Sequence, residues 1–247
     1  MQAVLALWQR LVPVLRLLGW VAVLALLTGL SLWQLRRAEE KTQRIDAFAQ
    51  AQTGPGQDAP DERAARRRAG DDAVFVKTCL TGRYDAARQF LLDGQVQAGQ
   101  AGLHVWTPLR RQTGAPVIVD RGWVAQDAER GPAESIEVGG GERFVCGMLT
   151  RFPRSGWRLP APPATTWPRN VVYPDSADLE AALASPVYPL VLLLDPHAPD
   201  GFRRQWQPVS LGPERHYGYA LQWTGLALTW IVATIAYRRR HRRSASR

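Results

Sequence analysis

The chain has 247 residues, with 31 Lys and Arg against 22 Asp and Glu and a formal net charge of +9, and this length suits one or two domains. Much of the positive charge is local, because six of the last ten residues are arginine. A basic cluster directly after an apolar segment is typical of an anchor on the cytoplasmic side of a membrane. We therefore expect membrane lipid as a partner and no nucleic acid.

The first predicted element is an apolar segment near the N-terminus. No charged residue lies between Leu17 and Trp33, and we assign residues 1–11 to a cytoplasmic N-terminus and residues 12–35 to a transmembrane helix. A cleaved signal peptide would need a small-x-small site after the apolar run, whereas bulky residues follow it here. We therefore expect an uncleaved anchor.

The next segment, residues 36–72, is expected to have two parts. Residues 34–51 are rich in Ala, Glu, Lys, Gln and Arg and contain no Gly or Pro, which favours a helix that continues out of the membrane. Residues 52–72 are rich in Gly, Pro, Asp and Arg, which is typical of a flexible linker. Its three arginines at 66–68 are expected in solvent, with lipid headgroups as the alternative.

Residues 73–215 change to short β-like runs separated by Gly and Pro. Strands are predicted at 73–80, 90–96, 103–109, 117–124, 144–150 and 187–194. Residues 113–116 are predicted to form a hairpin turn. A short helix is predicted to begin at Asp175 or Ser176, either of which can cap it, and to end at Pro186. Residues 153–174 hold six prolines and are expected to form an extended surface loop.

These elements predict an α+β membrane protein. Two transmembrane helices flank a mainly antiparallel β domain, which is either a small sheet or a partly open barrel.

Two cysteines, Cys79 and Cys146, each lie in an apolar, strand-like run. On the exported side of a membrane they could form one disulfide. The apolar neighbours instead favour two buried thiols that pack as small hydrophobic side chains. No Cys-x-x-Cys motif is present, which argues against a thiol oxidoreductase.

The second apolar segment, residues 216–237, is followed by a basic tail at 238–247. The uncharged run 217–237 would rise roughly 31 Å as a helix, enough to cross the hydrocarbon core of a bilayer. Two spans put both chain ends on one side, and the terminal arginines predict that this side is the cytoplasm. The β domain is then expected outside the cytoplasm.

An aromatic stripe follows one histidine at the start of this second segment. His216, Trp223, Trp230 and Tyr237 recur every seven residues, and Tyr219 lies beside the first two. Such a stripe, which drifts only about 20° per heptad, could cover a flat macrocycle whose iron binds the imidazole. A lone histidine at a helix mouth also bonds lipid headgroups or main chain, so the pattern leaves both interpretations open. Arginines expected near this interface could pair with the macrocycle's carboxylates: Arg36, Arg37, Arg203, Arg204 and Arg215.

Small residues recur at four-residue spacing in both apolar segments. They are Ala22, Ala25 and Gly29 in the first, and Gly225, Thr229 and Ala233 in the second. This spacing predicts that the two helices pack against each other through these faces.

Motifs of common enzymes are absent from the sequence. There is no nucleophile elbow, phosphate loop, His-Glu-x-x-His or dinucleotide fingerprint. His104 and His197 are interpreted as ordinary residues of the domain. We expect no enzymatic activity.

Four segments carry motifs in a fixed order. They are Trp33-Gln34-Leu35-Arg36, then Gly102 with Thr107-Pro108-Leu109, then Asp120-Arg121-Gly122-Trp123, and finally His216 to Trp223 with Tyr219. Together they resemble the surfeit-locus family of cytochrome c oxidase assembly proteins over nearly the whole chain. Two positions depart from the family pattern, since Asp120 replaces the usual Asn and Gln222 stands where Thr is common.

The resemblance implies an assembly factor for a haem-copper oxidase, a multi-pass protein of the bacterial inner membrane with its central domain in the periplasm. It implies that haem a binds transiently at the membrane surface, with His216 as the axial ligand of the iron and Tyr219 and Trp223 against the ring. The partners it implies are the catalytic subunit of the oxidase and the machinery of haem a synthesis. A scaffold that holds nascent subunits without binding haem is the alternative.

Other motif residues are expected to serve structure or partner binding. Gly122 is expected to allow a tight backbone bend, Arg121 to pair with a carboxylate of the domain or of a partner, and Trp123 to lie in the core. Trp33, Gln34, Arg36, Gly102 and Pro108 belong to the same group of motif positions.

Overall fold

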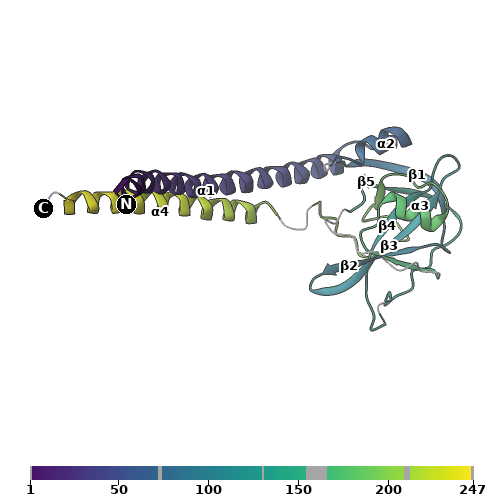
Figure 1. The fold of residues 1–247 in the computed structure, drawn as a ribbon. Coiled ribbons are helices and arrows are strands. Elements are labelled where there is room, and N and C mark those ends of the chain that lie inside the picture. The colour runs from purple at the N-terminus through teal and green to yellow at the C-terminus, as the bar shows by residue number, and fades with distance from the viewer. Residues whose placement is uncertain (1, 72–73, 130, 154–165, 209–211, 246–247) are drawn as a thin grey trace. The chain divides into compact units, whose positions relative to one another are not determined.

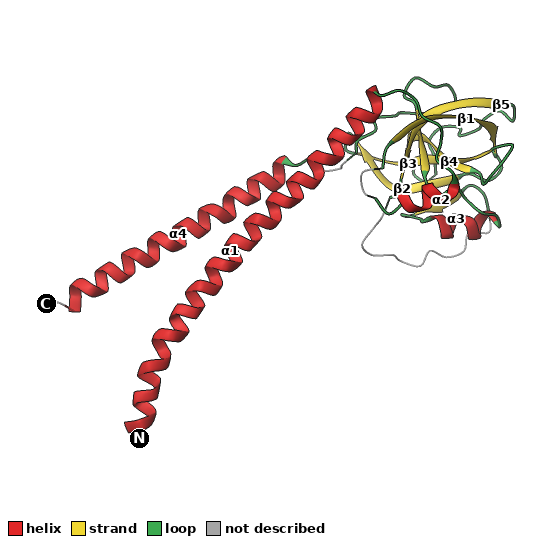
Figure 2. Cartoon of the chain, turned by 90° about the horizontal axis from the view of Figure 1, so that it is seen from above, coloured by secondary structure: helices red, strands yellow, loops and turns green. Residues whose placement is uncertain are grey.

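The computed structural model of the protein describes residues 2–71, 74–129, 131–153, 166–208 and 212–245 (Figure 1). The chain divides into two compact units, which are Met1–Ile45 with Val209–Arg247, and Asp46–Pro208. The first unit is a pair of long helices, and the second is built on a β-sheet (Figure 2).

The helix pair consists of α1, Gln2–Thr53, and α4, Glu214–Ala245. By length and composition, Leu11–Thr53 and Glu214–Arg240 are each apolar and long enough to cross a membrane. The expected helical extension beyond the first apolar segment is confirmed, because α1 continues without a break to Thr53. The absence of Gly and Pro from residues 34–51 accounts for this continuity.

The two helices pack along a seam whose positions are spaced by three or four residues. In α4 the less exposed positions include His216, Ala220, Trp223, Ala227, Ile231 and Thr234, and in α1 they include Trp20, Leu24, Leu27, Ser31, Gln34 and Ala38. This spacing is that of helices wound gently around each other.

Polar side chains lie along this seam at three levels. The Trp20 Nε1 donates to Thr234 Oγ1 at 2.6 Å, and the hydroxyls of Ser31 and Thr224 share a hydrogen bond of 2.9 Å. The third level is the bond between His216 and Gln34. In apolar surroundings such bonds fix which faces of two helices meet.

The small-residue faces that were expected at this contact lie elsewhere, so that prediction was wrong. A Cβ atom added to Gly29 or Gly225 would meet nothing within 4 Å. Ala22, Ala25 and Thr229 are exposed as well. The hydrogen-bonding residues, together with small Ala220 and Ala227 on the same face, determine the contact instead.

The sheet has seven strands in the order β1-β5-β7-β4-β3-β2-β6. The strands are β1 Val76–Tyr84, β2 Phe90–Gln97, β3 Gln100–Arg110, β4 Val117–Ala125, β5 Glu142–Thr150, β6 Arg169–Val171 and β7 Val191–Leu194. The pairs β4–β7 and β2–β6 are parallel and the others are antiparallel. The end of β1 also pairs with β3 over two residue pairs, which curls the sheet.

The predicted strands are therefore confirmed, with boundaries shifted by a few residues, and β6 was not predicted. The sheet is mixed and is not a closed barrel. The Pro-rich stretch at 154–165, where most of the surface loop was expected, lies outside the described residues.

Apolar side chains cover both faces of the sheet, and β4 in its interior is therefore buried on both sides. On one face, Leu179 and Leu183 of α3, Ser176–Leu183, pack with Ile118 and Trp106. Of the two predicted capping residues, Asp175 is the cap, since its side chain accepts from the Asp178 amide. The opposite face carries a second core of the sheet domain, formed by Val117, Val119, Tyr188, Leu192 and others.

The stretch expected to be a flexible linker contains a helix, α2, Glu62–Arg68. Asp61 caps it, and Ala65 is fully buried in the core beneath it. The hydroxyl of Tyr188 donates to the Pro60 carbonyl at 2.6 Å, which fastens the start of this segment to the sheet domain. The sequence of residues 52–72 did not predict α2 because only one residue of this helix, Ala65, is buried.

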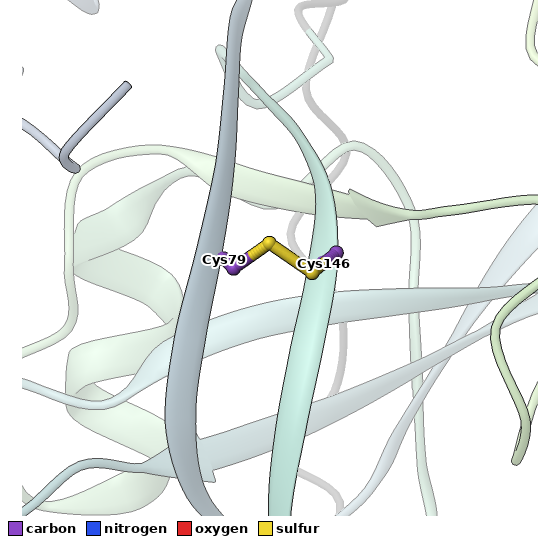
Figure 3. The surroundings of a disulfide bond; sticks show 2 residues. All are labelled: Cys79 and Cys146. Atoms are coloured by element: carbon purple, nitrogen blue, oxygen red, sulfur yellow. A yellow bond between two sulfur atoms is a disulfide. The ribbon is translucent and has the colours of Figure 1, made fainter. Parts of the chain in front are cut away.

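Cys79 and Cys146 form a disulfide, so the prediction of two buried thiols was wrong (Figure 3). The two residues are directly paired in the register of β1 and β5. Along β1 the side chains alternate, so that Thr78 and Leu80 are buried while Cys79 is exposed. The apolar neighbours that suggested burial therefore face the other side of the strand.

Candidate functional site

His216 lies in the first turn of α4, and its ring is fastened to α1. The Nδ1 atom of His216 is 2.7 Å from the Gln34 Oε1. An amide oxygen can only accept, so the imidazole carries its proton on Nδ1 when it is neutral. The lone pair of a neutral ring is then on Nε2, which is the atom that can bind a metal.

This contact joins two motifs that lie far apart in the sequence, since Gln34 and His216 are separated by 182 residues. The side chain of His216 is partly exposed. Within the described residues, no three His, Cys, Asp or Glu side chains gather in a way that could hold a metal ion. A single imidazole nevertheless suits an iron whose other ligands come from a macrocycle.

The aromatic residues predicted beside His216 differ in exposure. Tyr219, one turn further along α4, is 51% exposed, whereas Trp223 is partly buried in the helix seam. Trp33 is 50% exposed, and the Arg37 guanidinium lies 5.9 Å from the centre of its ring. Apolar ring surface is thus available on the helix pair near His216.

The arginines predicted to pair with carboxylates fall into two groups. Arg36, Arg37 and Arg215 are exposed on the helix pair. Arg203 stacks on the Trp123 ring at 5.0 Å, and Arg204 donates to the carbonyls of its own loop. Burial lowers the pKa of Arg204, with nearby Asp195 and Tyr84 opposing the effect. Arg204 therefore holds its loop in place, although it was predicted to bind a ligand.

Gly102 and Trp123 come from different motifs and meet on neighbouring strands. A Cβ atom on Gly102 would overlap the indole ring of Trp123 and the Val124 carbonyl. Trp123 is 3% exposed, as expected of a core residue. Glycine is therefore required at position 102, because the Trp123 indole ring occupies the space that a larger side chain would fill.

A β-bulge lies at the centre of the Asp-Arg-Gly-Trp motif. Between the pairs His104–Trp123 and Trp106–Asp120, β4 advances by three residues while β3 advances by two. Gly122 has a φ of +111°, and a side chain there would crowd the Arg203 carbonyl. The predicted backbone bend is thus a bulge, and glycine is the residue that tolerates it.

Arg121, which precedes this glycine, is buried and donates mainly to main-chain oxygens. Its Nε is 2.6 Å from the Asp200 carbonyl, and its Nη1 is 2.8 Å from the Ile136 carbonyl. The ring of Phe202 lies 4.9 Å from the guanidinium carbon. Burial lowers the pKa of Arg121, with Tyr84 and Asp200 opposing the effect. Among the described residues the guanidinium forms no ion pair with a carboxylate of the domain, and it instead ties two loops to the sheet.

Thr107 and Pro108 border this cluster on β3. The Thr107 hydroxyl donates to the Gln89 Oε1 at 2.7 Å, and the same oxygen accepts from the Arg121 Nη1 at 3.1 Å. The carbonyl of Pro108 accepts from the Asp85 amide at 2.8 Å.

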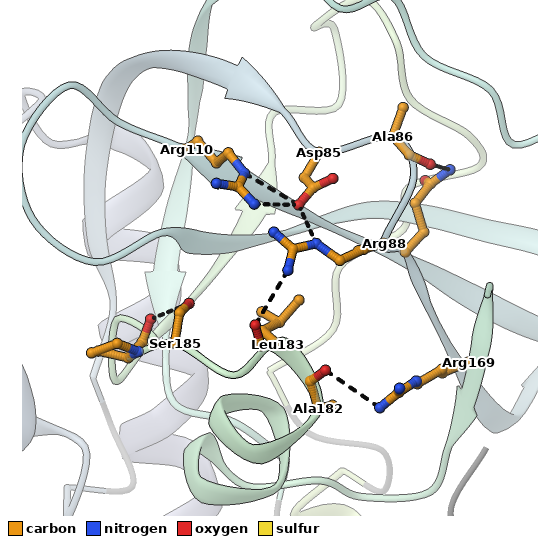
Figure 4. A network of polar contacts seen from close by, with 10 residues as sticks. Asp85, Ala86, Arg88, Arg110, Arg169, Ala182, Leu183 and Ser185 are labelled. Carbon is orange, nitrogen blue, oxygen red and sulfur yellow. Dashed lines mark hydrogen bonds and ion pairs between the residues drawn. The ribbon is translucent and has the colours of Figure 1, made fainter. Parts of the chain in front are cut away.

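Pro108 also lines a pocket of about 400 Å³, at which Asp85 binds two arginines (Figure 4). The distances from the Asp85 Oδ2 are 2.8 Å to the Arg88 Nε and 3.0 Å to the Arg110 Nη2.

The contacts of Arg121, Thr107 and Pro108 show that the motif residues of the sheet domain serve mainly to hold its loops.

His104 and Asp120 form a buried pair that the sequence interpretation missed. The Asp120 Oδ2 lies 2.8 Å from the His104 Nδ1, and its Oδ1 accepts from the Gly122 amide at 3.0 Å. Burial lowers the pKa of His104, but the charge and hydrogen bond of Asp120 outweigh it, so the pKa is raised above its ordinary value. The signal in the sequence was Asp120 itself, an acid in an apolar strand, on the strand beside His104.

Comparison with known proteins agrees with the motifs. A search of curated proteins gave no match. The model of the SURF1 family matches residues 21–228, which includes the four motif segments, the whole sheet domain and the helix contact of His216 with Gln34. On this match over most of its length, the chain belongs to the SURF1 family, the surfeit-locus family of proteins with a role in cytochrome c oxidase assembly.

Proposed function

We propose that this protein is an inner-membrane assembly factor of a bacterial haem-copper oxidase that binds haem a at His216 and passes it to the catalytic subunit. The observation that carries the proposal is the bond from the His216 Nδ1 to the Gln34 Oε1 at 2.7 Å. It fixes the neutral tautomer and leaves Nε2 as the ligand atom. The two helices long enough to span a membrane support a membrane location.

The residues around His216 fit such a ligand. Tyr219 offers exposed aromatic surface one turn from the imidazole, and Trp223 continues it toward the apolar part of α4. Arg36, Arg37 and Arg215 supply positive charge on the same helix pair for the carboxylates of the ligand. When bound, haem a supplies an iron that accepts one imidazole nitrogen.

The proposed mechanism is transport and placement, with no bond made or broken in the cargo. A single axial ligand can be exchanged, so the acceptor subunit can replace His216 when it offers its own ligands. Gln34 acts as a positioning residue, since it orients the ring and restricts its tautomer. The sheet domain, stiffened by Arg121 and the disulfide, would be the part that contacts the oxidase subunit.

The test is haem retention by the full-length chain, purified after co-expression with the enzymes of haem a synthesis. We expect His216→Ala to abolish the visible absorption of bound haem and Gln34→Leu to weaken binding about 10- to 100-fold. The matched control is His197→Ala, because His197 is an exposed histidine of the sheet domain. Full haem content in His216→Ala would refute the ligand assignment and favour the scaffold without haem.

A further inference from the structure

A groove between α1 and α4 lies at the other end of the helix pair from His216. It has a volume of about 1300 Å³ and is lined by residues from Trp8 to Val23 of α1 and from Trp230 to Arg238 of α4. At 1.5 Å per residue, Trp230 lies roughly 21 Å along the helix from His216. The groove is therefore separate from the proposed haem site.

The lining of this groove combines apolar and aromatic surface with two positive charges. Trp20, Trp230 and Tyr237 contribute rings, while Arg16 and Arg238 contribute the charges. The guanidinium of Arg238 lies 6.0 Å from the ring centre of Trp20. Within the described part of the chain, no acidic residue lines the groove. The charges that line the groove are therefore both positive.

The contact beneath the groove is fixed by a hydrogen bond. The Trp20 Nε1 donates to the Thr234 Oγ1 at 2.6 Å, so the indole links the two helices. Gly19 lies beside it, and a Cβ atom there would meet nothing within 4 Å. The space next to this contact is thus open to a ligand and is not filled by the helices themselves.

We propose that this groove is a binding site for an anionic phospholipid. Its acyl chains would lie against the aromatic and aliphatic lining, and its phosphate would bind Arg16 and Arg238. Both helices are long and apolar enough to cross a membrane, which puts acyl chains beside them. Trp, Tyr and Arg gathered at one helix end are typical of the bilayer interface, and basic pockets between membrane helices bind anionic headgroups. A zwitterionic lipid lacks the net charge that the two arginines would select.

The charge test measures lipid retention by the full-length, haem-free protein in detergent. Native mass spectrometry would follow phosphatidylglycerol and phosphatidylcholine of the same chain length, supplied in equal amounts. We expect the wild type to retain phosphatidylglycerol preferentially, and Arg16→Gln with Arg238→Gln to weaken that binding about fivefold per arginine. The control is Arg239→Gln with Arg240→Gln, which removes the same charge at exposed positions outside the groove.

The volume test uses two glycines of α1. Gly19→Leu places a side chain in the groove, whereas Gly29→Leu places the same side chain on the same helix outside it, and neither new Cβ meets a neighbouring atom. We expect Gly19→Leu to reduce the bound phosphatidylglycerol and Gly29→Leu to leave it unchanged.

Three results would overturn the lipid site. The first is equal retention of the two lipids by the wild type, and the second is an equal loss of binding in the two double arginine variants, which would indicate diffuse attraction to the basic tail. The third is a Gly19→Leu protein that retains lipid as the wild type does. Because these measurements use haem-free protein, they are independent of the test at His216.

Discussion

Replacing Arg121 by methionine gives the sharpest test of how the motif residues stabilise the sheet domain. Methionine keeps much of the length and the apolar stem, but it removes every donor. The carbonyls of Asp200 and Ile136, now bonded at 2.6 and 2.8 Å, would lose a charged partner. Each lost bond of this kind costs about 1.5–3 kcal/mol. With allowance for the relief of burying a charge, we expect a loss of about 3–5 kcal/mol.

The assay is thermal unfolding of the purified chain in detergent, followed by tryptophan fluorescence. For a domain of this size, each 1 kcal/mol lowers the melting temperature by about 2–4 °C, so Arg121→Met should lower it by about 6–20 °C.

Arg203→Met is the matched control because Arg203 is exposed and stacks on Trp123 at 5.0 Å. Its loss should cost about 0.5–1 kcal/mol. Equal melting temperatures for the two variants would show that the carbonyl bonds of Arg121 do not stabilise the domain.

Three further changes probe other parts of the sheet domain. Gly102→Ala should cost about 1–3 kcal/mol, since the new methyl group overlaps the Trp123 ring, and an unchanged melting temperature would contradict that packing. Replacing Cys79 by serine opens a disulfide of sequence separation 67 and should cost about 2–4 kcal/mol in chemical unfolding; equal stability of the oxidised wild type and the variant would argue against the bond.

Asp120→Asn should lower the pKa of His104, which is raised in the folded protein. The stabilisation by the charged imidazole is complete below about pH 6.5 and is lost as the pH rises through the raised value. The gap in melting temperature between wild type and variant should therefore be larger near pH 6 than near pH 9, and a gap independent of pH would refute the pair.

Local pattern was enough to predict most elements of the fold. The strands followed from short apolar runs between Gly and Pro, and α3 followed from Asp175 at its start. Pairing was not predictable in the same way, since β7 lies between β4 and β5, far from both in sequence. The disulfide was missed for a related reason, because the exposure of Cys79 depends on which face of β1 the core covers.

The candidate site was predictable only in part. The motifs singled out both His216 and Gln34, but their contact depends on the rotation of two helices about their axes, which the seam residues decide. Small residues suggested the wrong faces, because the hydrogen bonds of Ser31 and Trp20 outweigh the close approach that glycines allow. The pair of His104 with Asp120 was overlooked because it depends on a bulge in β4, which shifts the pairing of that strand with β3.

The position of β7 also constrains how the protein is made. This strand is the last of the sheet to be synthesised, yet it lies in the interior of the sheet, paired to β4 on one side and β5 on the other. Until Leu194 has left the ribosome, the earlier strands cannot form the complete sheet, because the strand between β4 and β5 is missing. Completion of the sheet is therefore postponed until nearly all of the domain has been synthesised.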